Sequence, residues 1–227
     1  MKNINYLKNM EIAHRGIHNN TTIPENSFAA FAIAKARKIS IELDIRLTKD
    51  HQIVVFHDKN LKRMTGIDKN LSDCSLKEIK SFKLLNTTSK IPLFSEILTL
   101  IDKDILIDIE IKEKNHLICN KLVQELKNYN GNIIISSFYP NIINWFRRKE
   151  PKYIRGLIIG IDLSSRLVLP TYCKPDFLAI SKKQIQFNKI QKFRDNGTII
   201  FAWTIKEQQE KDKYKNYADS FISNIEP

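Results

Sequence analysis

The chain has 227 residues, a length that suits one large domain, two small ones or a single α/β barrel. Apolar residues make up 42% of it, which excludes a disordered chain. The net charge of +12 suits an anionic partner, but the Lys residues are spread along the chain and no nucleic-acid motif appears, so we expect no nucleic-acid partner.

Short β-rich runs alternate with helical patterns along the chain. Near-continuous apolar strands alternating with helices indicate a parallel sheet covered by helices. About eight such units favour a closed (β/α)8 TIM barrel over an open sheet, and no G-x-G-x-x-G follows the first strand. The runs lie at residues 11–16, 40–48, 53–58, 104–112, 132–138, 154–160, 176–181, 198–205 and 219–224, and helical patterns at 27–37, 116–129, 141–150 and 188–197.

Residues 59–93 depart from this alternation. They hold turn residues and one short helical pattern at 75–82. We therefore expect a small insertion between the second strand and its helix, within a single barrel domain that covers residues 1–227.

The last strand leaves no residues for an eighth helix before Pro227, so we expect a shortened C-terminus without that helix. The outer faces of the first and last strands, with Ile12 and Phe221, would then need another cover. We expect residues 3–10 to pack across this seam and to bury Ile4, Tyr6 and Leu7. The other covers considered are the helical pattern at 206–217 and a second subunit, so a homodimer is the alternative to a monomer.

Carboxylates alternate with isoleucines in two strands. Glu42 and Asp44 share one face of their strand, and Asp108, Glu110 and Lys112 share one face of another. Facing carboxylates inside a barrel repel one another unless a cation neutralises them, and Ca²⁺ or Mg²⁺ prefers such oxygen ligands. The pattern predicts a metal site at Glu42, Asp44 and Glu110. A structural ion network with Arg15, Arg46 or Lys112 is the alternative.

Two histidines stand at the ends of β-rich runs, where barrel enzymes carry their functional groups. His14 ends the first run and His57 ends the run at 53–58. Beside an acidic cluster, such a pair is typical of acid–base catalysis. We expect His18, His51 and His116 at the surface, and Asp58 to form a turn.

The three cysteines, Cys74, Cys119 and Cys173, form no C-x-x-C pair, which argues against a zinc site and a disulfide framework. The first ten residues lack the apolar core of a secretory signal, and no apolar run reaches the length of a membrane span. We expect a soluble cytoplasmic protein.

From about residue 11 to the C-terminus, the chain resembles the glycerophosphodiester phosphodiesterases. Five segments carry the resemblance: AHRG at 13–16, PENSFAAF at 24–31, residues 41–58, IEIK at 109–112 and AWT at 202–204. The resemblance implies a TIM barrel whose catalytic histidines are His14 and His57, with Arg15 and Lys112 contacting the phosphate. It implies metal ligands at Glu42, Asp44 and Glu110, aromatics near the mouth at Phe138 and Trp203, and a small insertion over the site.

Four positions depart from the family's pattern. Lys206 stands where the family usually has Asn, Ile39-Ser40 lacks the usual Gly, and Lys62 replaces an acid while Arg63 is kept. The last strand ends in Ser223-Asn224 instead of near Thr-Asp. None of them removes a metal ligand or a histidine, so they bear on substrate preference.

The expected reaction is metal-dependent hydrolysis of a glycerophosphodiester to glycerol 3-phosphate and an alcohol. One histidine takes a proton from the nucleophile, either water or the neighbouring glycerol hydroxyl, and the other gives one to the leaving alkoxide. The alternatives are a lysophospholipid substrate and a non-catalytic protein that binds a phosphorylated glycerol or head group.

Overall fold

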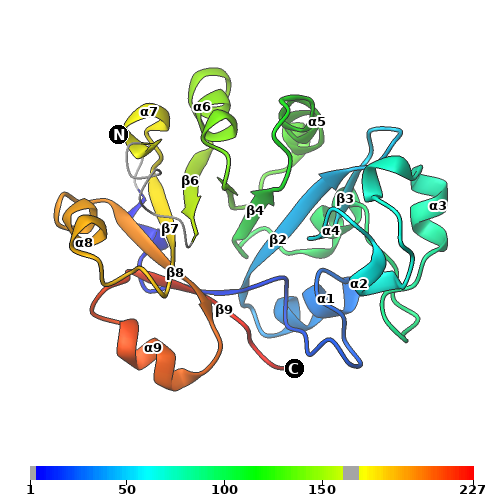
Figure 1. Cartoon of the computed structure of the whole chain (residues 1–227), viewed down its shortest axis with the longest axis horizontal. Helices are drawn as coiled ribbons and strands as arrows, with labels where there is room; N and C mark the ends of the chain where they lie inside the picture. The colour runs from blue at the N-terminus through cyan, green and yellow to red at the C-terminus, as the bar shows by residue number, and fades with distance from the viewer. Residues whose placement is uncertain (1–3, 161–168) are drawn as a thin grey trace.

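Eight parallel strands close into a barrel, which confirms the predicted fold (Figure 1). The computed structural model describes residues 4–160 and 169–227. Strand β1 pairs with both β9 and β2, and this double pairing closes the cylinder. The barrel strands are β1 (Glu11–Ala13), β2 (Ser40–Leu47), β4 (Ile107–Ile111), β5 (Ile133–Ser137), β6 (Ile154–Ile159), β7 (Phe177–Ser181), β8 (Ile199–Ile205) and β9 (Ser220–Ser223).

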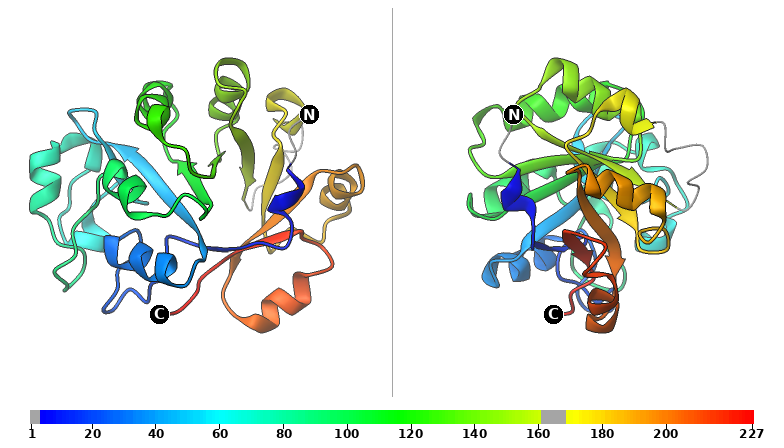
Figure 2. Two further views of the ribbon diagram at one scale, coloured as in Figure 1. Left: turned by 180° about the vertical axis from the view of Figure 1, so that it is seen from behind. Right: turned by 90° about the vertical axis from the view of Figure 1, so that its left-hand side faces the viewer.

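Helices surround the strands, as the two further views show (Figure 2). Ser27 caps the first of them, because its hydroxyl accepts a hydrogen bond from Ala30 N at 3.1 Å. Gly197, in the left-handed region at φ +86°, follows the end of α8 as predicted. The main outer helices are α1 (Phe28–Ala36), α4 (Phe94–Leu100), α5 (Leu117–Glu125), α6 (Pro140–Lys149), α7 (Leu169–Cys173), α8 (Asn188–Asp195) and α9 (Gln208–Tyr214).

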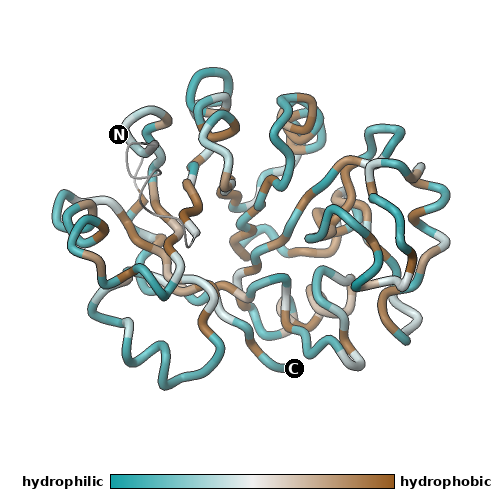
Figure 3. Tube along the Cα trace, viewed as in Figure 1, coloured by the Kyte–Doolittle hydropathy of each residue, from teal (hydrophilic) through white to brown (hydrophobic). Residues whose placement is uncertain are grey.

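The two faces of β2 differ as the alternation predicts. Ile41, Leu43 and Ile45 are fully buried in a cluster with Phe31 of α1, whereas Glu42 and Asp44 face the barrel interior. Apolar colour accordingly follows the strands and polar colour the outer turns of the helices (Figure 3). No helix in the described residues is long and apolar enough to cross a membrane.

A second apolar cluster fills the barrel itself. Phe177 and Phe201 stack there with ring centroids 4.6 Å apart. Gly156 makes room for them, since a Cβ at this position would lie 2.1 Å from Phe177 Cζ. The half of the barrel beneath the polar residues is therefore a packed core.

The N-terminal segment joins this interior cluster instead of the outer seam. Leu7 is fully buried within it, and Ile12 also faces inward, so the expectation that Ile12 needs an outer cover was wrong. Tyr6, expected to be buried, is 49% exposed. The segment is held by Ser220, whose hydroxyl donates to Leu7 O and accepts from Met10 N at 3.0 Å. Of the predicted range 3–10, residues 4–10 are described.

The outer side of β9 has other neighbours. Phe221 packs with Tyr214 and Tyr217 around α9, and Lys211 Nζ lies 5.8 Å from its ring centroid. Residues 224–227 follow β9 without a helix and run back towards α1, where Arg37 donates to Glu226 O at 3.0 Å. The outer side of this seam is therefore covered by α9, within the helical pattern at 206–217 that was the alternative cover, and not by the described part of residues 3–10.

The run at 53–58 does not join the barrel. Its strand β3 (Ile53–Val55) pairs antiparallel with β2 at the edge of the closed sheet. The 59–93 segment follows, with α2 (Lys62–Thr65), α3 (Leu76–Ser81) and the 3-10 turn η2 (Leu71–Asp73). It encloses an apolar cluster of its own, which includes Met64 and Ile79, and lies beside β2 and β3 (Figure 1).

Candidate active site

A cavity of about 110 Å³ opens at the carboxyl ends of the barrel strands. Eight of the nine residues singled out from the sequence line it, and the ninth, Asp44, is fully buried and contacts two of them. The eight are His14, Arg15, Glu42, His57, Glu110, Lys112, Phe138 and Trp203.

Three carboxylates from neighbouring strands gather at the floor of this cavity, with Asp44 buried behind the other two. Glu42 and Asp44 come from β2 and Glu110 from β4, and one oxygen of each lies within 4.8 Å of the others. Burial raises the pKa of Glu42 well above its usual value, and the charges of Asp44 and Glu110 raise it further. Burial likewise raises the pKa of Glu110. Protein groups alone thus leave this negative charge incompletely balanced.

Two cations lie against Asp44. Arg15 Nε is 3.3 Å from Asp44 Oδ2, and Lys112 Nζ is 3.3 Å from Asp44 Oδ1 and 2.6 Å from Glu110 Oε1. Although burial alone would raise the pKa of Asp44, Lys112 and Arg15 keep it below its usual value. The ion pairs considered as the alternative to a metal site are therefore present for these two cations. Arg46, the third cation considered, instead donates to His57 O and pairs with Glu113.

The residues present fit a hard divalent cation. Glu42 Oε1 is buried without a hydrogen-bond partner in the described chain, and the three carboxylates supply oxygen ligands of the kind that such ions prefer. Asp108, fully buried beneath them, lines the same cavity, and burial raises its pKa to about 7. Asp108 is not a member of the group of three.

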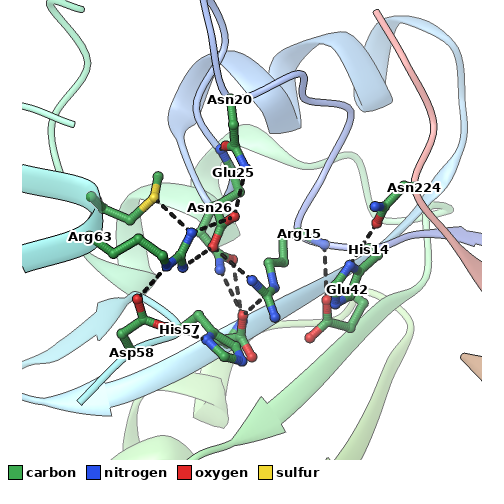
Figure 4. Close-up of polar contacts among 12 residues, drawn as sticks. His14, Arg15, Asn20, Glu25, Asn26, Glu42, His57, Asp58, Arg63 and Asn224 are labelled. Atoms are coloured by element: carbon green, nitrogen blue, oxygen red, sulfur yellow. Dashed lines mark hydrogen bonds and ion pairs between the residues drawn. The ribbon is translucent and has the colours of Figure 1, made fainter. Parts of the chain in front are cut away.

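The two histidines have different partners at Nδ1. His14 Nδ1 lies 2.9 Å from Asn224 Oδ1, and His57 Nδ1 lies 2.6 Å from Asp58 Oδ1 (Figure 4). Burial, reinforced by Arg15, lowers the pKa of His14 to about 3. Burial also lowers the pKa of His57, against the opposing charge of Asp44. Asp58 does more than form a turn, because it holds His57.

Arg63 of the 59–93 segment connects both sides of the site (Figure 4). Its Nη2 donates to Glu25 Oε1 at 2.6 Å and its Nε to Asp58 Oδ2 at 2.6 Å. Glu25 in turn accepts from Arg15 Nη1 at 2.8 Å. One guanidinium thus orients the carboxylate that holds His57 and the carboxylate that holds Arg15.

A loop after β1 supplies two further contacts to the acidic strand. Arg15 itself has φ +58°, and its backbone N–H donates to Glu42 Oε2 at 2.9 Å. Asn26 Nδ2 donates to Asp44 Oδ2 at 2.7 Å. The segment PENS, which stood out only by resemblance, therefore contributes Glu25 and Asn26 to the site. His18 of this loop is half-buried, not at the surface as expected, and both of its ring nitrogens are buried.

Two aromatic residues form an apolar wall of the cavity. The rings of Phe138 and Trp203 meet edge to face at 5.6 Å, and Trp203 Nε1 donates to Ala179 O at 3.1 Å. Lys112 Nζ lies 5.6 Å from the centroid of Phe138. This wall is apolar beside a charged floor, which suits a small ligand with an anionic group and a carbon skeleton.

Comparison with protein families matches residues 14–220 to the Glycerophosphoryl diester phosphodiesterase family. The chain belongs to this family. It is therefore an enzyme of the phosphoric diester hydrolase class. A glycerophosphodiester phosphodiesterase from Caldanaerobacter subterraneus subsp. tengcongensis is 34% identical over 91% of this chain and 90% of its own length. A lysophospholipase D from Homo sapiens is 34% identical over 52% of this chain and 41% of its own.

Solved structures agree on the fold. A phosphodiesterase from Oleispira antarctica, in complex with the product sn-glycerol-3-phosphate, matches 96% of this chain and 94% of its own at a TM-score of 0.87 and 22% identity. A glycerophosphodiester phosphodiesterase from Thermotoga maritima matches 95% and 94% at a TM-score of 0.78 and 26% identity. The barrel and its helices are thus shared across the family.

Proposed function

We propose that the protein hydrolyses glycerophosphodiesters to glycerol 3-phosphate and an alcohol in a metal-dependent reaction. The observation that carries the proposal is the meeting of three buried carboxylates, two cations and two histidines at one cavity, which all of them line except Asp44, buried against Arg15 and Lys112. A binding protein for a phosphorylated glycerol needs the cations, but it does not need an acid–base pair.

Glu42, Asp44 and Glu110 would hold the metal ion, for which Ca²⁺ and Mg²⁺ are the candidates because all three ligands are carboxylates. A bound ion supplies positive charge that helps to neutralise the phosphate oxygens as negative charge grows on them. Arg15 and Lys112 supply the same kind of charge from the protein side. Phe138 and Trp203 would pack against the glycerol skeleton.

We assign the proton transfers from the partners of the histidines. Asn224 offers His14 only a neutral amide oxygen, and with the pKa at about 3 the ring stays neutral, as a general base must be. Asp58 offers His57 a carboxylate, which stabilises the imidazolium form. His14 thus takes the proton of the nucleophile, and His57 protonates the leaving alkoxide.

The test is release of glycerol 3-phosphate from purified protein supplied with glycerophosphocholine, glycerophosphoglycerol or glycerophosphoinositol. We expect release with Mg²⁺ or Ca²⁺, loss of release with EDTA, and recovery when the ion is restored. A parallel assay with lysophosphatidylcholine measures the lysophospholipid alternative. Absence of release from every glycerophosphodiester, with either ion present, contradicts the proposal.

A further inference from the structure

A second, larger hollow of about 490 Å³ adjoins the active-site cavity. It lies between the 59–93 segment and the loop that follows β4, and Lys112 lines both spaces. An alcohol attached to a phosphate held at Lys112 can therefore extend into this hollow. With the glycerol packed against Phe138 and Trp203, the alcohol that leaves during hydrolysis would occupy this second hollow.

The hollow is lined by cations. Arg46, Lys59, Lys112 and Lys114 face it, and Glu113 is the one acidic residue among the described residues that line it. Lys112 is already paired with Glu110 and Asp44, and Arg46 Nη1 pairs with Glu113 at 3.2 Å. The remaining charge comes from Lys59 and Lys114.

These two lysines are left without carboxylate partners, unlike others nearby. Lys62, Lys69 and Lys80 of the same segment pair with Asp68, Glu78 and Glu96. Lys59 and Lys114 form no ion pair with any described residue, and Lys114 Nζ instead lies 5.3 Å from the ring centroid of Tyr139. The positive charge of the hollow is thus uncompensated, as expected for a surface that binds an anion.

Arg46 connects the hollow to the proton donor. Its Nε donates to His57 O at 2.8 Å, and its side chain is 12% exposed, so the guanidinium is fixed at the boundary between the hollow and the active site. An alcohol that takes its proton from His57 therefore lies near a fixed guanidinium, and the two lysines line the same hollow as that guanidinium.

We propose that this hollow, defined by Arg46, Lys59, Lys112 and Lys114, binds an anionic group on the alcohol of the substrate. The preferred substrates are then glycerophosphodiesters whose alcohol carries a further phosphate. The inference depends on the proposed function, because it describes the leaving-group side of the same site.

A matched pair of substrates tests the charge of the alcohol alone. Glycerophosphoinositol and glycerophosphoinositol 4-phosphate differ by one phosphate and release the same glycerol 3-phosphate. We expect kcat/KM to be roughly tenfold higher for the phosphorylated substrate at low ionic strength, since partly exposed charge pairs act over a few ångströms. Because salt screens such pairs, the ratio should fall towards one at about 0.5 M NaCl.

A pair of double variants then locates the effect. Lys59→Glu with Lys114→Glu reverses the free charge of the hollow and should bring the ratio to one or below. Lys189→Glu with Lys192→Glu, on exposed positions of α8 that line a different hollow, makes the same change in net charge and should keep the wild-type ratio. Hydrolysis of glycerophosphoinositol by each variant shows that it is folded.

Two results overturn the proposal while leaving the proposed function intact. One is a wild-type ratio at or below one with both substrates cleaved. The other is a ratio that the hollow variant and the α8 variant change equally. If no glycerophosphodiester of any kind is cleaved, the proposed function fails and this inference fails with it.

Discussion

At the scale of single residues, the partners of His14 and His57 decide how the two rings differ. Both rings line the same cavity, but His14 contacts the neutral amide of Asn224, whereas His57 contacts the carboxylate of Asp58. By the resemblance to the family, Asn224 stands near the position where an Asp was expected. Exchanging the charges of the two partners therefore tests the assignment of base and acid.

We predict that Asn224→Asp moves the acidic limb of the kcat–pH profile to higher pH, because a carboxylate raises the pKa of His14 and a base must be deprotonated. Asp58→Asn should move the basic limb to lower pH, because the pKa of His57 falls and an acid must be protonated. Between about pH 4 and 10, the wild type should show no acidic limb from His14, whose pKa is about 3, whereas Asn224→Asp should bring that limb into the range, and the basic limb is compared directly. Shifts of the opposite limbs would exchange the two roles.

Removal of either imidazole ring should lower the rate of catalysis. His14→Ala and His57→Ala should each lower kcat by roughly a hundredfold or more, the usual scale for general acid–base catalysis. Metal affinity, measured by calorimetry, should change little, because neither ring belongs to the carboxylate group of three. A variant that loses the metal instead would show that its histidine is a ligand.

Glu25 links the site to stability against acid. Burial alone would raise its pKa, but the hydrogen bonds of Arg63 and the charge of Arg15 lower it from 4.5 to about 2. A depressed folded-state pKa stabilises the fold above about pH 4.5, and this stability is lost as the pH falls towards 2. The shift corresponds to about 3 kcal/mol.

We therefore predict that Glu25→Gln makes the free energy of unfolding less dependent on pH in the acidic range. Urea unfolding at pH 7, 4.5 and 3 should show a smaller decrease in the free energy of unfolding for the variant than for the wild type. Comparing the decrease, not the absolute value, removes the cost of the lost ion pairs. Equal decreases in both proteins would mean that Glu25 titrates normally in the folded state.

At the scale of elements, strands were predictable and loops were not. The period of two in β2 and β4 places Glu42, Asp44 and Glu110 on inward faces, and both faces were read correctly from the sequence. Glu25 and Arg63 come from a loop and from the 59–93 segment, where no period constrains a side chain. Their meeting is a result of the tertiary fold, although PENS and Arg63 stood out by resemblance.

The short length of β1 explains why the face of Ile12 was predicted wrongly. Ile12 was assigned to the outer face, but β1 reaches the barrel with Ile12 inward and Ala13 outward. In a strand of three residues, the alternation is too short to show which side chains face inward, because Ala occurs on either face.

The contact between β6 and β7 gives a test of interior packing. Gly156→Ala would place a methyl group 2.1 Å from Phe177 Cζ, and the stacked ring of Phe201 limits how far Phe177 can move. We expect a loss of about 1–3 kcal/mol in the free energy of unfolding by urea. Adding Phe177→Leu should recover part of it, whereas a further additive loss would show that the two side chains do not compete for space.

At the scale of the whole molecule, the barrel separates stability from chemistry by its two ends. The carboxyl ends of the strands carry charges that repel one another, and the opposite end is closed by apolar side chains, including Leu7 from outside the barrel strands. The sequence indicated that residues near the N-terminus close the fold, but not that they do so through the barrel's interior.

Substitutions at the neighbouring residues Leu7 and Tyr6 test whether the N-terminal segment closes the barrel through its interior or at its outer side. Leu7→Ala removes a side chain that is fully buried beside Ile12 and Ile222, and should lower the free energy of unfolding by about 2–5 kcal/mol. Tyr6→Ala removes a ring that is 49% exposed and should cost much less. Urea unfolding followed by tryptophan fluorescence measures both, and kcat of the folded Leu7 variant should stay near the wild-type value because the site lies at the other end. If Tyr6→Ala proves the more costly change, the segment is held at its outer side, and the plug formed by Leu7 contributes little to closing the barrel.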